Sequence, residues 1–350
     1  MAGRKSRASE PSRPAASIRD VAALAGVSIG TVSNTINHPE MVRRHTRAAV
    51  EQAIAELGFV PNQQARVLTG ASSQVIGLVV LDIMSPFFME VAGGVERAAN
   101  EAGHVMILCD SENSREREAA LLQMLSAQRV RGVLLTPASS NVAQIRKSVR
   151  SRKLPIVSLD YQDSLKHCSV STDHVAGARL AVRHLLELGH ERIAFVGGPT
   201  LLHQFAQRSR GAREELQAAG LDPETHLVEE SVDAIGIRDG ILAAERLLAG
   251  DMPTAVFCGN DMLAFGVYRG LAQAGVRVPE DVSLVGYDDN TFASDWIVPL
   301  TSVRQPSYEL GYRAASLLLE HSSGDAAHVN QKVVLPPELV VRASSGPCNR

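Results

Sequence analysis

The hydrophobic pattern of the chain changes near residue 73. From Gln74 onward, short uninterrupted runs of Val, Ile and Leu alternate with amphipathic segments of helical period, as where "VIGLVVLDI" precedes "MEVAGGVERAANEAG". The alternation pauses near "CSVSTD" and then resumes as far as "VSLVGYDD". Such runs are typical of parallel strands that are buried on both faces beneath covering helices. We therefore expect an α/β core over residues 74–350, with two doubly wound parallel sheets and a ligand crevice at the carboxyl ends of their strands.

The segment 17–62 has no strand-like run and carries three short helical patterns instead. Each pattern begins at a side chain suited to capping a helix, and these side chains are Ser17, Ser28 and Thr46. Gly26 ends the first helix in a tight turn, so the first two helices form a helix-turn-helix arrangement. We expect a small all-α headpiece in this segment.

The second helix presents an outward face without charge. If Val32 and Ile36 pack inward, the opposite stripe consists of Ile29, Gly30, Ser33, Asn34 and Asn37. An amide there can bond an adenine edge bidentately, and an isoleucine can contact a thymine methyl group. The hydroxyls suited to phosphate contacts near helix N-termini are those of Ser17, Thr31 and Ser33. In the alternative interpretation these residues only cap and turn a small bundle, although a solvated helix face would normally carry Lys and Glu.

Charge is distributed unevenly between the two parts. Residues 1–70 contain 9 Lys and Arg against 5 Asp and Glu, whereas the remainder contains 26 against 33. A basic N-terminal segment on an otherwise acidic chain indicates that this segment binds a polyanionic partner. Residues 1–16 are basic and rich in Ser, Pro and Ala without an apolar run, which predicts a disordered tail and no export signal or membrane anchor. Four cysteines without a CxxC pair predict buried thiols in a reducing cytoplasm.

The segment 63–73 is rich in Gln, Ala and Ser and is too short to form a stable isolated helix. Its apolar pair, Val67 and Leu68, would have no core to enter in a plain linker. A hinge helix that forms only on DNA would place Leu68 as a wedge in the minor groove, with Arg66 beside it. A surface linker with an incidental leucine stays open as the alternative.

Several motifs together resemble the LacI/GalR family of bacterial repressors. They are "IRDVAALAGVSIGTVSNTIN", "AIAELGFVPNQQARVLTG", "GNDMLAFG", "VSLVGYDD" and "LTSVRQPSYELG", and the resemblance extends from Ser17 to about Arg342. The headpiece and hinge motifs are specific in combination, whereas the body motifs are shared more loosely with periplasmic sugar-binding proteins. The resemblance implies a two-lobed periplasmic-binding-protein-like core, a DNA-induced hinge helix and a homodimer on a pseudo-palindromic operator.

The resemblance also assigns roles in DNA binding. Ile29, Gly30 and Asn34 stand where family members read bases, and Leu68 stands where the minor-groove leucine lies. Many members have an arginine in place of Asn34, so we expect a preference for adenine over guanine at that base. They commonly have a serine in place of Arg43, so this arginine adds a phosphate contact. The remaining backbone contacts are expected from Ser17, Thr31, Ser33, Asn37 and Thr46.

The predicted crevice carries groups suited to a small polyol. Carboxylates, amides and an arginine can grip vicinal hydroxyls, and an aromatic ring can cover an apolar sugar face. By strand-end position and by resemblance, the effector residues are Asp82, Ser85, Phe88, Asp160, Arg208, Asn260, Asp288 and Gln305. Helix capping is the commoner role of a lone strand-end Asp, and a structural salt bridge between Arg208 and Asp288 is the alternative for that pair. The first lobe is expected at about 74–172 and 306–330, and the second at about 173–303 and 331–342.

Other classes of protein are less compatible with the sequence. The phosphate loop, the nucleophile elbow and the HExxH zinc pair are all missing, so we expect no catalytic site, no cofactor and no metal. A solute-binding sensor without a DNA-binding role would explain the two lobes equally well but not the headpiece. The ligand groups fit a monosaccharide best, whereas a disaccharide, a sugar phosphate or a nucleobase acting as co-repressor stays open.

Overall fold

The computed structural model describes residues 16–60, 73–138, 154–161, 168–199, 202–322 and 329–349. The chain divides into two compact units, Met1–Ser73 and Gln74–Arg350. This division falls at the residue where the hydrophobic pattern changes. The predicted tail, apart from Ala16, and the hinge residues Arg66 and Leu68 lie outside the described residues.

The first unit is a three-helix headpiece. Its elements are α1 (Ile18–Ala25), α2 (Ile29–Asn37), the 3-10 turn η1 (Pro39–Met41) and α3 (Arg44–Leu57). Val21, Val32 and Val50 are fully buried between the helices, which confirms the predicted inward stripe at Val32. Gly26 ends α1 at a φ of 63°, and the Ser28 hydroxyl accepts the Thr31 N–H at 3.1 Å. The predicted helix-turn-helix arrangement is therefore confirmed.

The predicted start of the third helix is wrong. The helix begins at Arg44 with Arg43 as its N-cap, two residues before Thr46. The Thr46 hydroxyl instead lies 3.1 Å from the ring Nε2 of His45. Neither Gly nor Pro holds residues 44–46 out of the helix, and the exposed positions of Arg44 and His45 leave water free to satisfy the first N–H groups. A side-chain cap is consequently not needed to start the helix.

Two six-stranded sheets form the second unit, one in each lobe. The first sheet is wholly parallel, in the order β11 (Lys332–Leu335), β5 (Cys168–Thr172), β4 (Ile156–Leu159), β3 (Val133–Leu135), β1 (Val75–Val80) and β2 (Val105–Asp110). The second has the order β12 (Glu338–Val340), β10 (Thr301–Arg304), β9 (Ser283–Asp288), β8 (Ala255–Cys258), β6 (Ile193–Gly197) and β7 (Leu227–Ser231), with β12 antiparallel. The predicted two-sheet fold is confirmed.

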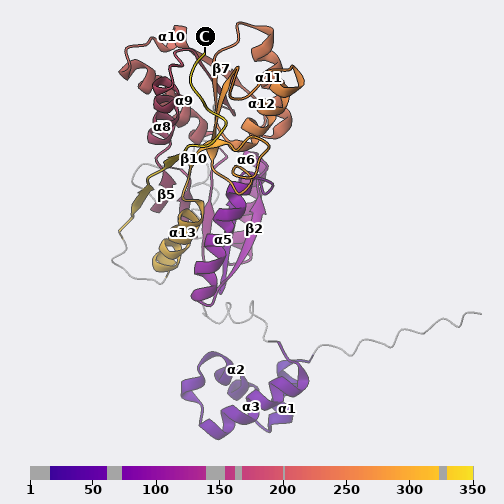
Figure 1. The fold of residues 1–350 in the computed structure, drawn as a ribbon. Coiled ribbons are helices and arrows are strands. Elements are labelled where there is room, and N and C mark those ends of the chain that lie inside the picture. Colours follow the sequence, from indigo (N-terminus) through magenta and orange to yellow (C-terminus); the bar gives the residue numbers. More distant parts are fainter. Residues whose placement is uncertain are drawn as a thin grey trace, which may run out of the picture. The chain divides into compact units, whose positions relative to one another are not determined.

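Helices cover both faces of each sheet (Figure 1). On the first sheet these are α5 (Pro86–Glu101) and α13 (Ser307–Ser322) on one face and α6 (Arg115–Ala127) on the other. On the second sheet they are α11 (Ile237–Ala249) and α12 (Asp261–Gln273) opposite α8 (His174–Glu187) and α9 (His203–Ala218), with the short α10 (Pro223–His226) after α9. Burial on both faces explains the uninterrupted apolar runs in the sequence.

The boundary between the lobes near the carboxyl end differs from the prediction. The sequence interpretation placed residues 331–342 in the second lobe, but Lys332 pairs with Ser169 and Leu335 with Thr172, so β11 belongs to the first sheet. The chain crosses only after Leu335, at "PP". Proline has no N–H to donate to a strand ladder, which ends β11 at that point. The chain thus passes between the lobes after β5, after β10 and after β11.

Two glycines let α5 and α13 touch. A Cβ added at Gly94 would lie 2.0 Å from the carbonyl oxygen of Tyr308, and one at Gly311 would lie 2.0 Å from that of Val91. We expect Gly94→Ala to force the helices apart and lower the free energy of unfolding by about 1–3 kcal/mol, measured by urea denaturation. Gly93→Ala is the matched control, because its nearest contact would be the Tyr308 ring at 3.9 Å. Equal losses in both variants would contradict the close crossing.

Two further features concern the helices and the cysteines. Among the residues that the structure describes, no helix is both long and apolar enough to cross a membrane. The four cysteines form no disulfide; Cys109, Cys168 and Cys258 are buried, and Cys348 is half-buried, which is less than the sequence predicts for it.

Candidate functional site

The headpiece presents an uncharged helix face. On α2, Val32 and Thr35 are buried, whereas Gly30 and Asn34 are exposed and Ile29 is 46% exposed. The helical period places the three exposed residues on one side and the two buried residues on the other. The structure therefore brings the three predicted base-reading residues together on one solvent-facing surface.

The predicted backbone-contacting side chains are partly engaged within the headpiece. The Ser17 hydroxyl donates to the Asp20 carboxylate at 2.7 Å, and the Asn37 amide donates to the Ser33 hydroxyl at 3.3 Å. The hydrogen bonds from Ser17 lower the pKa of Asp20, so a negative charge already occupies the start of α1. A phosphate contact from Ser17 would have to compete with this carboxylate. Arg43 is exposed at the start of α3, and none of the described residues forms an ion pair with it.

Charge within the described headpiece is balanced. Residues 16–60 contain four Lys and Arg and four Asp and Glu. The basic excess of the N-terminal segment therefore lies in residues 1–15 and 61–72, outside the described residues. The uncharged face of α2, and not a basic patch, is the feature that distinguishes this unit.

A second candidate site lies where the two lobes meet. Six of the eight predicted effector residues line one crevice there, and these are Ser85, Phe88, Asp160, Arg208, Asn260 and Asp288. The first three come from the first lobe and the last three from the second. The crevice has a volume of about 20 Å³, which is room for about one water molecule. A larger ligand would require the lobes or side chains to move apart.

Arg208 is buried at the centre of this crevice. Its guanidinium carbon lies 3.8 Å from the centroid of the Tyr287 ring, and its Nη1 donates to the carbonyl oxygen of Gly259. Its Nε has no hydrogen-bond partner within the part of the chain that the structure describes. Among the described residues, no carboxylate forms an ion pair with Arg208, so the alternative of a structural salt bridge to Asp288 is not what the structure shows. An unpaired buried donor is typical of a group that awaits a ligand or a water molecule.

His174 links Arg208 to Asp160. The Nη2 of Arg208 lies 3.3 Å from His174 Nδ1, and His174 Nε2 lies 2.9 Å from an Asp160 oxygen. Because arginine can only donate, Nδ1 must accept, and the ring proton is assigned to Nε2, toward Asp160. Burial raises the pKa of Asp160, but His174 and Arg208 outweigh it, and the net pKa is lowered. Asp160 therefore carries its charge at neutral pH.

Asp288 behaves in the opposite way. Burial raises its pKa to about 7, although Arg208 and a 2.7 Å hydrogen bond from the Gln305 amide both favour its charged form. Asp288 and Asp160 both have positive backbone φ angles, 113° and 52°, which side-chain-bearing residues rarely adopt. Strain of this kind is concentrated at functional sites. The two strand-end carboxylates thus differ in charge while sharing an unusual backbone.

Asp82 and Gln305 do not line the crevice. The Asp82 carboxylate accepts the Met84 N–H at 2.8 Å and shapes the turn before α5, so its contact with an effector stays a prediction. The Gln305 amide instead donates a hydrogen bond to the Asp288 carboxylate. Asn260 lines the crevice but also caps α12, accepting the Leu263 N–H at 2.8 Å. Strand-end position alone did not separate these three roles.

Sequence reasoning missed four lining residues, which are Phe87, Gln204, Phe205 and Ile235. Gln204 and Phe205 precede Arg208 by four and three residues on α9, and helical spacing places them on the same face. That signal was present in the sequence. Ile235 comes from the loop before α11, and its approach depends on tertiary packing that no local pattern encodes.

The raised pKa of Asp288 makes stability depend on pH. Between its ordinary value of 3.8 and about 7, the folded protein keeps a proton that the unfolded chain has lost, so the free energy of unfolding falls as pH rises. From pH 6 to pH 8 this carboxyl should contribute a loss of about 1 kcal/mol in urea denaturation. The readout is the difference from Asp288→Asn, because His184, His190 and His203 have pKa values lowered by burial and favour the opposite trend. Identical pH profiles for the two proteins would contradict the raised pKa.

Within the described part of the chain, no group of three His, Cys, Asp or Glu side chains is arranged to hold a metal ion. The crevice instead offers two carboxylates, a guanidinium, an amide and aromatic rings. These groups suit a neutral polar ligand with several hydroxyl groups, or a planar ligand between rings.

Two family models match the chain. Residues 17–62 match the bacterial regulatory proteins, lacI family, and residues 182–345 match the periplasmic binding protein-like domain. These ranges correspond to the headpiece and to most of the second lobe with the segments that follow it. The two matches reproduce the combination of units seen in the structure.

Relatives extend over nearly the whole chain. The HTH-type transcriptional repressor PurR of Pasteurella multocida is 34% identical over 331 residues, covering 94% of this chain and 98% of the relative. The ribose operon repressor of Escherichia coli is 35% identical over 333 residues, covering 94% and 100%. The solved lac repressor dimer bound to operator and the anti-inducer ONPF has a TM-score of 0.83 at 30% identity, covering 95% and 99%. With its helix-turn-helix headpiece and its two-lobed core, the chain belongs to the lacI family of bacterial regulatory proteins.

Proposed function

We propose that this DNA-binding transcriptional repressor recognises its operator through α2 and that a sugar bound in the crevice controls its affinity for DNA. The observation that carries the proposal is the convergence of Asp160, Arg208 and Asp288 on one buried crevice from both lobes. The carboxylates can accept hydrogen bonds from the hydroxyls of a sugar ring, and the guanidinium can donate hydrogen bonds to them. The name of the Escherichia coli ribose operon repressor supports a monosaccharide as the effector class.

A nucleobase is the second candidate. The rings of Phe88 and Phe205 line the crevice from opposite lobes and offer apolar faces to a planar ligand. PurR of Pasteurella multocida supports this alternative at a similar identity. A purine would use the same carboxylates for its ring nitrogens, so the choice between the two classes needs a direct binding measurement.

We propose the DNA contacts from the exposed face of α2 and from the resemblance to the family. Ile29, Gly30 and Asn34 read base edges in the major groove, and Arg43 holds a phosphate. The hinge residues Arg66 and Leu68 act in the minor groove, where an apolar wedge unstacks a base step. A pseudo-palindromic operator follows if the repressor binds as a twofold symmetric dimer.

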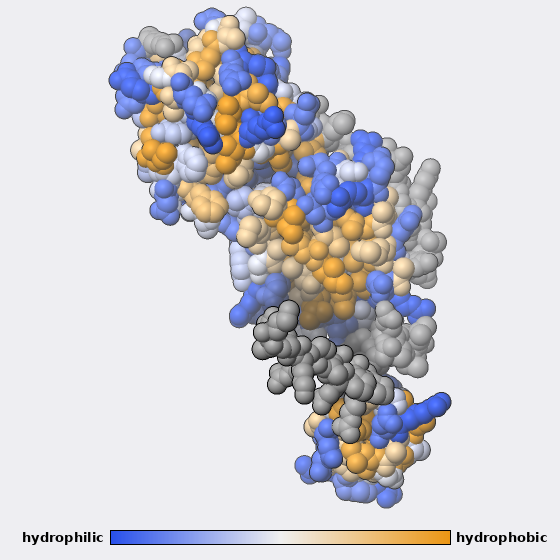
Figure 2. Space-filling view, turned by 90° about the vertical axis from the view of Figure 1, so that its right-hand side faces the viewer, coloured by the Kyte–Doolittle hydropathy of each residue, from blue (hydrophilic) through white to orange (hydrophobic). Residues whose placement is uncertain are grey.

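We infer a homodimer that uses the edge of the first lobe. Figure 2 shows apolar residues gathered on the face of the first lobe that carries β2. On this edge strand Val105 is 62% exposed and Ile107 is 40% exposed, and on the neighbouring α5 Met89 is 64% exposed. An unpaired strand edge with exposed apolar side chains is otherwise prone to aggregation. A second copy of the chain would bury it.

Signalling follows from the crevice being shared by two lobes. A ligand that binds the closed arrangement better than the open one shifts the equilibrium between them. The three segments that pass between the lobes would transmit this shift to the first lobe, from which the chain leads to the headpiece. The coupling between effector and operator is then a difference in affinity between two states.

A thermal-shift screen of the full chain tests the effector class. Monosaccharides, disaccharides, purines and sugar phosphates are added separately at millimolar concentration, and a ligand at 100 times its Kd should stabilise the fold by about 2.7 kcal/mol. Stabilisation by one or a few monosaccharides is the expected result. Stabilisation by purines alone would replace the sugar with a nucleobase. A response to none of these ligands would contradict the crevice as a site for them.

A further inference from the structure

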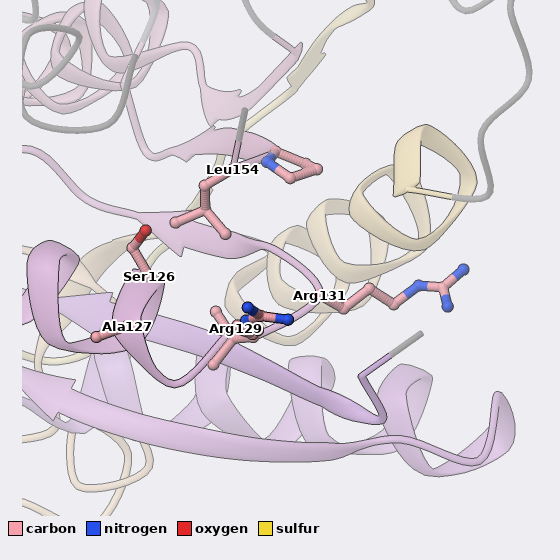
Figure 3. Close-up of a pocket in the computed structure, with 7 residues that line it drawn as sticks. Ser126, Ala127, Arg129, Arg131 and Leu154 are labelled. Carbon is pink, nitrogen blue, oxygen red and sulfur yellow. The ribbon is translucent and has the colours of Figure 1, made fainter. Parts of the chain in front are cut away.

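A second cavity lies at the opposite end of the first sheet from the effector crevice. It has a volume of about 780 Å³, within the range of small-molecule sites, and is lined by the end of α6, the loop from α6 to β3 and the start of β4 (Figure 3). The loop precedes β3, and Pro155 precedes β4, so the cavity is at the amino-terminal ends of these strands. None of its lining residues belongs to the crevice.

Two arginines dominate the polar lining of this cavity. Arg129 and Arg131 both come from the loop between α6 and β3, and Ser126 adds a hydroxyl at its wall. Among the described residues, neither guanidinium forms an ion pair, whereas most arginines of the core do. The described residues that line it include no carboxylate. Two cations beside one cavity, without a counter-charge among the described residues, suit an anion, and guanidinium groups match phosphate oxygens bidentately.

The backbone at Arg129 is held in a conformation that disfavours arginine. Six described helices are followed by a glycine in the left-handed conformation, and these glycines are Gly26, Gly58, Gly103, Gly189, Gly220 and Gly275. After α6 the same position, with a φ of 53°, is occupied by Arg129. The accompanying bond from Val130 N–H to the Leu125 carbonyl is the usual helix-ending pattern. An arginine that keeps a strained backbone at a position usually occupied by glycine indicates a functional role for its side chain.

The loop also holds the side chain of Arg131 in place. Val130, between them, is buried with Leu125 and Val133 in the cluster beneath α6. The Nε of Arg131 donates to the Ser322 hydroxyl at 2.6 Å, which leaves its terminal nitrogens for another partner. Little side-chain order must therefore be gained at Arg131 on binding, which favours affinity.

The geometry points to a phosphate-binding site formed by Arg129 and Arg131, separate from the effector crevice. The phosphate group could belong to a small phosphorylated metabolite or to a DNA backbone, and both present the same oxygens to the guanidinium groups. The loop adjoins the entry of the chain into the core, because Arg131 N–H donates to the Val75 carbonyl at 2.7 Å. A bound phosphate there would act where the core joins the segment that leads to the headpiece.

The test uses the full-length protein and two matched variants. Arg129→Gly removes the charge and also relieves the backbone strain, so the melting temperature without ligand should be unchanged or higher. Arg208→Met disables the effector crevice and leaves the second cavity intact. Inorganic phosphate, ribose 5-phosphate and ribose are titrated by calorimetry at low ionic strength, where screening is weak.

Inorganic phosphate should bind the wild type and Arg208→Met alike, and at least tenfold more weakly to Arg129→Gly. Ribose 5-phosphate should still bind Arg208→Met, in which the crevice no longer contributes. Ribose binding should not change in Arg129→Gly, which separates this site from the proposed effector site. If Arg129→Gly also lowers operator affinity in phosphate-free buffer, with a salt dependence reduced by about one counterion, the DNA backbone is the source of the phosphate. Unchanged operator affinity identifies a free anion. Equal phosphate binding by wild type and Arg129→Gly, or none by either, would overturn the site.

Discussion

Effector binding should be lost when Arg208 is replaced by methionine. Arg208 is 3% exposed, and its guanidinium lies over the Tyr287 ring. Its positive charge favours the ionised forms of both Asp160 and Asp288 and so lowers the pKa of each carboxyl. Methionine preserves the apolar stem but removes the fork of donors. Two lost hydrogen bonds to a charged group correspond to about 3 kcal/mol, or a rise in Kd of about 100-fold. Calorimetric titration with the ligand identified by thermal shift measures the change.

Two controls make the Arg208 experiment specific. Arg208→Lys keeps the charge without the planar fork and should have an intermediate effect. Arg210→Met removes an arginine two residues away on the same helix, where the guanidinium is exposed and paired with Glu214 at 2.7 Å. Effector binding should be unchanged in this variant. If Arg208→Met bound the effector as tightly as the wild type, Arg208 would have no part in the site.

Discrimination at one operator base pair should relax when Asn34 is replaced by alanine. Asn34 is exposed on the uncharged face of α2, and a bidentate amide contact to adenine is worth about 1–3 kcal/mol. This corresponds to a loss of about 5- to 150-fold on the preferred base and much less on the other three. Fluorescence anisotropy with operators that carry each of the four bases at every position measures the profile.

Asn37→Ala is the matched control on the same helix. The Asn37 amide is half-buried and donates to Ser33 at 3.3 Å, so its loss should weaken binding to all operator variants by a similar factor. A profile for Asn34→Ala that is shifted uniformly would place Asn34 against the DNA backbone. An unchanged profile would remove it from the interface.

The fold was predictable because its local signals agree with one another. Apolar runs such as "VIGLVVLDI" became β1 and the turn after it, and the caps at Ser17 and Ser28 start the first two helices. The start of the third helix was misplaced because Thr46 has a strong capping preference, whereas the chain enters the helix at Arg44 without a side-chain cap. Propensity describes what a residue favours in isolation, and tertiary context decides whether it is used.

The crevice was predictable in composition but not in detail. Strand ends identified Asp160, Asn260 and Asp288, because the carboxyl edges of parallel strands meet where ligands bind. The same rule also selected Asp82, whose carboxylate is used by its own turn. The network through His174 joins residues 160, 174 and 208, and no sequence period connects positions so far apart.

The site of Arg129 shows the opposite case. In the sequence it is one more arginine after an amphipathic helix, without a recognisable motif. Only its left-handed backbone, set against the glycines that follow six other helices, distinguishes it. Backbone conformation at helix ends is thus a source of functional hypotheses that charge patterning alone does not provide.

The most direct test of the account is the operator affinity of the full-length repressor with and without a saturating amount of the sugar that raises its melting temperature. We expect the sugar to change the operator Kd by about 5- to 150-fold, the usual range of allosteric coupling, and to leave it unchanged in Arg208→Met. Identical operator affinity with and without the bound sugar would contradict control of DNA binding from the crevice.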